Sequence, residues 1–317
     1  MLKIYYHRDF DGIASAAILA HILREVRGEI SVGWSGVNHD VRPRWRTFSE
    51  DERFAVVDFF YHPRAEYWFD HHPTTFVVPE WKQLYAPSAR HRWDTASPSC
   101  PPVILEHARE HWDFQPPARF EDLKHWSNKI DAARFDSVEE VLFGNAPALR
   151  IMRALTVAPA PDWSDFIVRQ LVDHDLESVA GLGEIEKRHE RACKNREKAL
   201  EQFPPTVVDI EDGVLLYDAT SNEIRRERFA AFYFHPEVHF AVGMIPTRGG
   251  LHVTAGENPW NLPRAGIDVG RMCERHGGGG HPAVGGVNPA DARDCKRIAR
   301  SLAVELRAQM RRFRSGA

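Results

Sequence analysis

The first third of the chain alternates short apolar runs with stretches whose apolar residues recur at helical spacing. This alternation is typical of a mostly parallel β-sheet with helices on both faces. From the pattern we expect strands at 2–6, 29–33, 54–58 and 67–70, and helices at 13–23, 103–111 and 120–130.

The pattern then changes twice. Residues 162–202 are highly charged and contain few helix breakers, which predicts one or two helices. Beyond Pro204-Pro205 we expect strands at 206–210, 214–217, 238–245 and 251–255, and helices at 268–276 and 292–313. The sequence therefore predicts an α/β protein with an N-terminal, mostly parallel-sheet domain (1–160), a helical linker (161–204) and a smaller α/β domain (205–317).

The length supports two domains, since the chain has 317 residues, and its composition is that of an ordinary globular protein. A formal net charge of −4 means that no overall basic field draws long nucleic acids to it. Basic residues gather locally at 307–314, which are either the solvated face of a final helix or a weak phosphate-attracting patch.

The cysteines point to a reducing compartment. The chain has 4 of them, widely spaced and without a CxxC pair: Cys100, Cys193, Cys273 and Cys295. This spacing disfavours disulfides and structural zinc, so we expect small buried or half-buried thiols in a cytoplasmic protein. The first apolar run is too short for a signal peptide, and no run approaches the length of about 18–20 residues that a membrane helix needs.

Acidic and histidine side chains follow several of the predicted strands. Residues 7–12 read HRDFDG, Asp58 ends a later strand, Asp70-His71-His72 ends the next, and Asp131 follows a helix. Parallel strands bring such residues to one edge of the sheet. Crowded carboxylates and imidazoles suit a pair of divalent ions such as Mn²⁺, which clamp a phosphoryl group when they lie about 3.5–4 Å apart.

Each of these residues also has a purely structural interpretation. Asp11 could be the N-cap of the helix that follows it, and Asp58 could cap a loop. The pair His71-His72 could be a solvated surface pair. Only the combination of all the segments favours a metal site.

A glycine run near the C-terminus suggests an anion site. Consecutive glycines let backbone N–H groups approach a phosphate without interference from Cβ atoms. A flexible linker is the alternative, but the run lies between a predicted helix and the segment 282–286, which favours binding. The residues expected to bind substrate are Gly277, Gly278, Gly279, Gly280 and His281, with Arg264 or Arg271 and Asn258 or Asn261 as further donors. Trp260 either stacks on a base or packs in the core.

Taken in order, these segments resemble a known family. HRDFDG, Asp58, Asp70-His71-His72 and Asp131 resemble the four motifs of the DHH phosphoesterases, and Gly277–His281 resembles the GGGH motif of the DHHA1 domain that follows in many members. The resemblance extends from residue 7 to about residue 287. It implies two ion sites that share Asp58: His7, Asp9 and Asp58 for one, and Asp11, Asp58, His71 and Asp131 for the other.

The same resemblance implies roles for the remaining motif residues. His72 would lie near the scissile phosphate, as a phosphate ligand or proton donor, and Asp70 would orient a histidine by accepting its ring proton. The HxDxDG spacing is that of the RecJ-type branch. The pyrophosphatase and nanoRNase branches more often place three residues between the histidine and the first aspartate.

We therefore expect a phosphoesterase with two divalent ions, with Mn²⁺ as the first choice and Mg²⁺ or Co²⁺ as alternatives. The N-terminal domain would perform the chemistry and the C-terminal domain would hold a short oligonucleotide, a linear dinucleotide or a nucleotide phosphate. The alternatives are an exonuclease on longer single strands, an exopolyphosphatase or pyrophosphatase, and a non-catalytic nucleotide sensor, which the complete ligand set disfavours. We expect no membrane partner, and a homodimer stays open.

Overall fold

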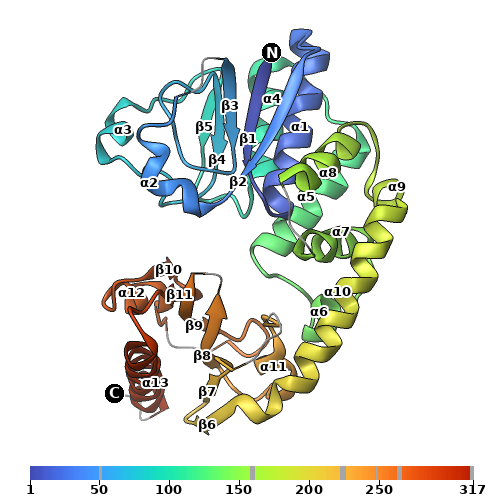
Figure 1. Ribbon diagram of the computed structural model, residues 1–317. Coiled ribbons are helices and arrows are strands. Elements are labelled where there is room, and N and C mark those ends of the chain that lie inside the picture. The colour runs from blue at the N-terminus through green and yellow to red at the C-terminus, as the bar shows by residue number, and fades with distance from the viewer. Residues whose placement is uncertain (50–51, 158–160, 222–225, 248, 263–265, 315–317) are drawn as a thin grey trace. The chain divides into compact units, whose positions relative to one another are not determined.

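The structure, a computed structural model, describes residues 1–314 apart from 50–51, 158–160, 222–225, 248 and 263–265. The chain divides into two compact units, which we describe separately (Figure 1). The N-terminal unit comprises 1–135 and 145–192, and the C-terminal unit comprises 136–144 and 193–317. The division thus falls inside helix α10 (Gly183–Gln202) rather than at the expected positions 160 and 204.

The N-terminal unit is built on a parallel five-stranded sheet with the strand order β2-β1-β3-β4-β5. The strands are β1 (Leu2–His7), β2 (Val32–Val37), β3 (Arg53–Val57), β4 (Tyr67–Asp70) and β5 (His91–Trp93). The chain crosses from β2 on one side of β1 to β3 on the other, so the strand order reverses beside β1. Such a reversal is where open α/β sheets bind their ligands.

The two faces of this sheet differ in their cores. Helices α1 (Phe10–Arg27), α4 (Cys100–Trp112), α5 (Ala118–Asp131) and α8 (Pro161–Asp173) cover one face with a largely aliphatic core (Figure 1). The other face carries an aromatic layer that includes Trp45 and Trp68, beside the short helices α2 (Arg42–Trp45) and α3 (Pro79–Leu84). Burial on both faces explains why the central strands β3 and β4 are short, mostly apolar runs.

Some elements of this unit differ from the prediction. The strand expected at 29–33 begins later, as β2 at Val32, because Gly28, with φ 64°, ends α1 and Ile30 is 89% exposed in the connection between them. The stretch 162–202 holds α8, α9 (Leu176–Ala180) and α10, rather than one or two helices. Helix α8 packs on α1 in the N-terminal unit, while α7 (Pro147–Thr156) and β5 were not predicted.

The C-terminal unit contains a six-stranded mixed sheet with the order β10-β11-β9-β8-β7-β6. Its strands are β6 (Val207–Glu211), β7 (Val214–Asp218), β8 (Phe240–Thr247), β9 (Gly250–Glu257), β10 (Gly279–His281) and β11 (Val284–Val287). Its helices are α6 (Val138–Phe143), α11 (Ala230–Phe234), α12 (Val269–Glu274) and α13 (Ala292–Arg314). Helix α13 packs its buried side chains on β7, β8 and β9.

The predicted fold class is confirmed in both units. The N-terminal sheet is parallel, and the second unit is a separate α/β body in which the β10–β11 hairpin adds strands that the sequence did not reveal. All four cysteines are free, as expected. None of the described helices is long and apolar enough to cross a membrane.

Candidate metal centre

The segment 7–12 joins β1 to α1. Asp9 is the N-cap of α1: its Oδ1 accepts a hydrogen bond of 2.9 Å from the N–H of Gly12, and its Oδ2 lies 2.7 Å from His7 Nδ1. The interpretation of Asp11 as the cap was wrong, since Asp11 lies in the first turn and is 2% exposed. A Cβ atom on Gly12 would lie 2.0 Å from the His7 carbonyl oxygen, so glycine allows the helix to begin this close to the strand.

Asp58 follows β3 and is the most constrained acid of the cluster. Its φ is 54°, a left-handed conformation that is uncommon for a non-glycine residue. It is 1% exposed, and neither of its carboxylate oxygens has a hydrogen-bond partner among the described residues. A strained backbone that carries a buried, unsatisfied carboxylate indicates a functional position.

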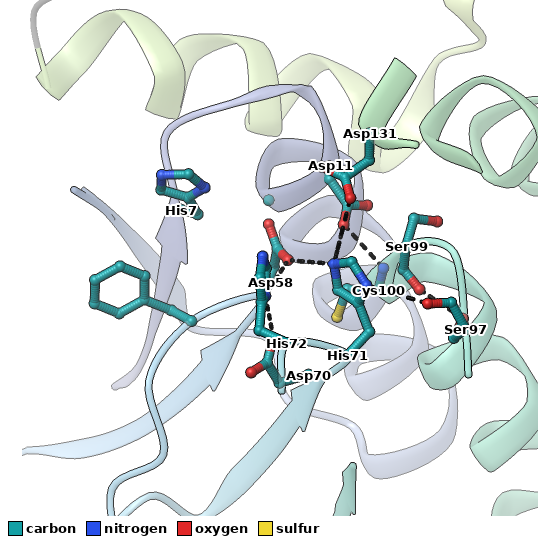
Figure 2. Close-up of polar contacts among 12 residues, drawn as sticks. His7, Asp11, Asp58, Asp70, His71, His72, Ser97, Ser99, Cys100 and Asp131 are labelled. Atoms are coloured by element: carbon teal, nitrogen blue, oxygen red, sulfur yellow. Dashed lines mark hydrogen bonds and ion pairs between the residues drawn. The ribbon is translucent and has the colours of Figure 1, made fainter. Parts of the chain in front are cut away.

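His71 points its Nε2 at the acids (Figure 2). Its Nδ1 lies 3.2 Å from the carbonyl oxygen of Ser97, which can only accept, so the proton resides on Nδ1. Nε2 faces the carboxylates of Asp11, Asp58 and Asp131, at 3.5, 3.5 and 3.6 Å, and has no hydrogen-bond partner among the described residues. A cation between this nitrogen and the carboxylates would give all of these groups a shared partner.

The structure brings every predicted ligand into the cluster. Three groups have ligand atoms within 4.8 Å of one another, and they are His7, Asp9 and Asp58; Asp11, His71 and Asp131; and Asp58, His71 and His72. Figure 2 shows Asp58 between His7 and His71. Oxygen and imidazole donors suit Mn²⁺ or Mg²⁺, and the unsatisfied atoms of Asp58, Asp11 and His71 fit such ions.

The acids also raise one another's pKa values. Burial, followed by the charges of Asp58 and Asp131, raises the pKa of Asp11 well above its usual value. Burial and the nearby Asp9 do the same to the pKa of Asp58. A bound cation would offset both effects, because it stabilises the ionised forms of these acids together.

His7 and Asp9 form an ion pair at the edge of the cluster. Burial alone would lower the pKa of His7, but the charge and hydrogen bond of Asp9 raise it overall. Burial likewise opposes the ionisation of Asp9, yet His7 and the N–H of Gly12 hold the pKa of Asp9 below its usual value.

His72 differs from His71 in what its ring contacts. Its Nδ1 lies 2.8 Å from Asp70 Oδ1, and Asp70 is 0% exposed. Burial would lower the pKa of His72, but the charge and hydrogen bond of Asp70 raise it to about 9. The indole N–H of Trp93 donates to the backbone carbonyl of His72 at 2.9 Å, which further fixes the loop.

Sequence reasoning missed the residues that support the cluster. The N–H of Cys100 at the start of α4 donates to Asp11 Oδ2 at 2.9 Å, and Ser99 Oγ donates to Asn128 Oδ1 at 2.6 Å. The sequence signal that could have pointed to this segment was Ser99, because serine is favoured just before the start of a helix. His39, whose ring centroid lies 4.8 Å from that of His7, had no signal, because it is a lone histidine far from any motif.

The predicted glycine site forms an edge hairpin rather than an open loop. Gly280 has φ 155°, and a Cβ atom on Gly278 would lie 2.0 Å from the carbonyl oxygen of Gly286, so hairpin packing already requires these glycines. Gly277, Gly278, Gly280 and His281 are exposed and Gly279 is half-buried, and their role in substrate binding stays a prediction. Arg264 lies outside the described residues.

Asn258 has a structural role in the connection after β9. It is 1% exposed, its Nδ2 donates to the carbonyl oxygen of Val238 at 2.8 Å, and its Oδ1 accepts from the N–H of Trp260 at 3.0 Å. These bonds leave its amide no open edge for a substrate, contrary to our expectation. Trp260 packs against Phe229, with ring centroids 5.5 Å apart, as the alternative interpretation has it.

The fold belongs to a recognised class. No protein-family model matches the sequence, and no curated protein matches it. The solved structures that resemble the chain include RecJ and a protein described by its DHH domain, so the chain has the DHH phosphoesterase fold, and the predicted resemblance is confirmed at the level of the fold.

Three of these structures show how far the similarity extends. A pGpG-specific phosphodiesterase, PggH from Vibrio cholerae, has a TM-score of 0.72 and 19% identity over 98% of this chain and 100% of that chain. RecJ of Thermus thermophilus in complex with Mn²⁺ has a TM-score of 0.61 and 16% identity, over 96% of this chain but only 52% of RecJ. An exopolyphosphatase-related protein of Bacteroides fragilis has a TM-score of 0.56 and 11% identity, over 98% of this chain and 93% of that chain.

Proposed function

We propose that this protein is a divalent-metal-dependent phosphoesterase that hydrolyses short oligonucleotides, linear dinucleotides or nucleotide phosphates. The observation that carries the proposal is Asp58, a buried carboxylate in a left-handed conformation whose oxygens have no hydrogen-bond partner among the described residues. Its carboxylate contacts His71 and His72, and it lies together with His7 in one of the groups of possible metal ligands. Such an arrangement is costly without a cation and well suited to one.

The ligand roles follow from the groups in the cluster. His7, Asp9 and Asp58 would hold one ion, and Asp11, Asp58, His71 and Asp131 the other. When bound, two divalent ions polarise a phosphoryl group and lower the pKa of a water molecule. The Ser97 carbonyl fixes the ring of His71, and the N–H of Cys100 fixes the carboxylate of Asp11. These supports keep the ligand atoms in place before any ion or substrate arrives.

His72 would act on the phosphate. Asp70 accepts from its Nδ1, so a hydrogen bond from this ring to a phosphoryl oxygen or a leaving group would come from Nε2. Asp70 also stabilises the protonated ring, which suits a hydrogen-bond donor to an anion.

The C-terminal unit would bind the part of the substrate away from the scissile bond. The support for this role is the exposure of Gly280 and His281 at the end of a glycine run that carries no Cβ atoms to keep an anion away. The hairpin that requires these glycines would also make the site rigid.

The similarity to the pGpG-specific phosphodiesterase favours a short substrate, because it covers nearly the whole of both chains. A further solved structure that resembles the chain is described as exonuclease RecJ and supports the alternative of longer single strands, and the exopolyphosphatase-related structure supports polyphosphate. All three alternatives use one class of chemistry, the attack of water on a phosphoryl group.

Hydrolysis by the purified protein with Mn²⁺ tests the proposal. The substrates are pGpG, single strands of graded length, polyphosphate and bis-p-nitrophenyl phosphate. We expect hydrolysis of pGpG or of the shortest strands to be fastest, and chelation by EDTA to abolish it. No turnover of any substrate with Mn²⁺, Mg²⁺ or Co²⁺ would contradict the proposal and favour the nucleotide sensor.

A further inference from the structure

Helix α13 carries basic residues along its whole length, but its two halves use them differently. In the C-terminal half, Arg307 forms ion pairs with Asp209 and with Glu211, the latter at 3.2 Å, and Arg311 pairs with Asp212 at 2.5 Å. These arginines hold the helix to β6 and the turn after it. The charges that they neutralise are those of the protein itself.

In the N-terminal half, most of the basic residues are unpaired. Arg293, Lys296 and Arg300 are exposed and make no ion pair among the described residues, while Arg297 pairs with Asp294 at 2.5 Å. Together with Ala292, these cations line an open hollow of about 630 Å³. We call Arg293, Lys296, Arg297 and Arg300 the basic face of α13.

The stability of the helix does not explain this face. Cations at the N-terminal end of a helix oppose the positive end of its dipole, and acids are the residues that stabilise that end. Asp291 already caps the first turn, because its carboxylate accepts from the N–H of Asp294 at 2.7 Å. Arg293, in the first turn, is therefore unfavourably placed in the isolated protein, and a bound anion would offset this.

The chemistry of the surroundings points to a polyanion rather than a membrane. The apolar side chains of α13 are buried against the sheet, and Val304, at 57% exposure, is the large exposed apolar residue closest to the basic face along the described part of this helix. A helix that inserts into a lipid surface needs an exposed apolar face. A row of charges with no apolar partner instead matches the evenly spaced phosphates of a nucleic-acid strand.

We propose that the basic face of α13 binds the phosphate backbone of single-stranded nucleic acid, as an accessory to the metal centre. From Arg293 to Arg300 the helix rises roughly 10 Å. A strand in duplex geometry has one phosphate per roughly 3.4 Å, and an extended single strand has a wider spacing, so about two phosphates of a single strand would lie along that length. The inference deepens the proposed function, on which the choice of nucleic acid rests, by extending the substrate beyond a dinucleotide.

Helix α10 offers a matched control. Lys194 and Lys198 are exposed, have the same spacing as Lys296 and Arg300, and also make no ion pair among the described residues. They differ in their surroundings, because Glu190, Glu197 and Glu201 lie on the same helix and neutralise the local field. Two charge reversals on either helix change the net charge of the protein by the same amount.

The test measures binding of a labelled single strand of about twelve nucleotides by fluorescence anisotropy, in EDTA so that no hydrolysis occurs. For Lys296→Glu with Arg300→Glu we expect affinity to fall at least about tenfold and the slope of log K against log salt to shrink by about 1.4, the contribution of two phosphate contacts. Lys194→Glu with Lys198→Glu should change the affinity less than about twofold. Melting curves confirm that both variants fold.

Equal losses in the two variants, no loss in the α13 variant, or a wild-type protein that does not bind the strand would each overturn the inference. Inorganic polyphosphate serves as the competing polyanion. If the α13 variant lost only polyphosphate binding, the assignment to nucleic acid would be wrong. Because the measurement needs neither metal nor turnover, it stays informative even if the proposed phosphoesterase activity fails its own test.

Discussion

The two units differ in whether the buried polar residues of their sequence motifs have hydrogen-bond partners. In the N-terminal unit, Asp58 and His71 are buried with polar atoms that have no hydrogen-bond partner among the described residues. In the C-terminal unit, Asn258 is equally buried, but its side-chain amide forms hydrogen bonds with backbone groups that lie before β8 and after β9. The comparison teaches that burial alone does not mark a site. A buried polar group signals a ligand when its hydrogen bonds are missing.

The largest effect should come from Asp58→Asn. The substitution keeps the size of the side chain and tolerates positive φ, but it removes the charge shared by the two proposed ion sites. We expect kcat/KM to fall by about 10³-fold or more, since several kcal/mol of charge stabilisation would be lost. Asp113→Asn is the matched control, because Asp113 also has positive φ, at 49°, and is exposed. Similar rates for both variants in a hydrolysis assay would contradict the account.

His72→Ala should have the next largest effect and separates chemistry from metal binding. Loss of a group that donates to the phosphate lowers kcat by roughly 10²–10⁴-fold. Both ions should remain bound, because the ring nitrogen of His72 that lies nearest Asp58 is already occupied by Asp70. If elemental analysis showed that the variant loses an ion, His72 would be a ligand and its role would have to be exchanged with that of His71.

His281→Ala asks whether the C-terminal unit contributes to binding. A lost hydrogen bond to a charged phosphate should raise KM for dinucleotides by about tenfold. Bis-p-nitrophenyl phosphate, which lacks the remote group, should be affected much less. Both substrates are measured on one preparation. Equal loss on the two substrates, with an unchanged melting temperature, would place His281 in the chemistry itself.

Asn258→Ala should have the smallest effect on catalysis and a clear effect on stability. The substitution leaves the carbonyl of Val238 and the N–H of Trp260 without their partner. We expect a loss of about 1–3 kcal/mol in the free energy of unfolding and an unchanged KM. Chemical denaturation measures the change in the free energy of unfolding, and steady-state kinetics measure KM. A raised KM with unchanged stability would restore Asn258 as a substrate contact.

The sequence indicated which residues of the N-terminal unit gather in the acidic cluster better than it indicated where the helices and strands of that unit begin and end. Strands that end in Asp or His are visible as apolar runs followed by acids, and the parallel sheet brings those ends together, so the proposed ligands could be named in advance. The residues that support the cluster could not be named in advance. Ser97 and Cys100 act through backbone atoms, which every residue type has, so the sequence does not reveal them.

The C-terminal unit shows the reverse limitation. The glycine run attracted attention as a loop, although tight contacts with Gly286 and Val284 require glycine in a hairpin. Local composition could not distinguish these causes, since a close approach of backbone and a phosphate cradle select the same residue. Likewise, the arginines at 307–314 drew notice by their density, but Arg307 and Arg311 are paired with acids about 100 positions earlier in the chain, which only the fold reveals.

The most direct test of the central claim is the number of ions bound per chain. Isothermal titration with Mn²⁺, checked by elemental analysis after gel filtration, compares the wild type with Asp58→Asn and Asp113→Asn. The account predicts two ions for the wild type and for the Asp113 variant. For the Asp58 variant it predicts a loss of both ions or a large fall in affinity, together with the loss of the rise in melting temperature that Mn²⁺ gives the wild type. Two ions still bound with unchanged affinity when Asp58 is replaced would contradict it.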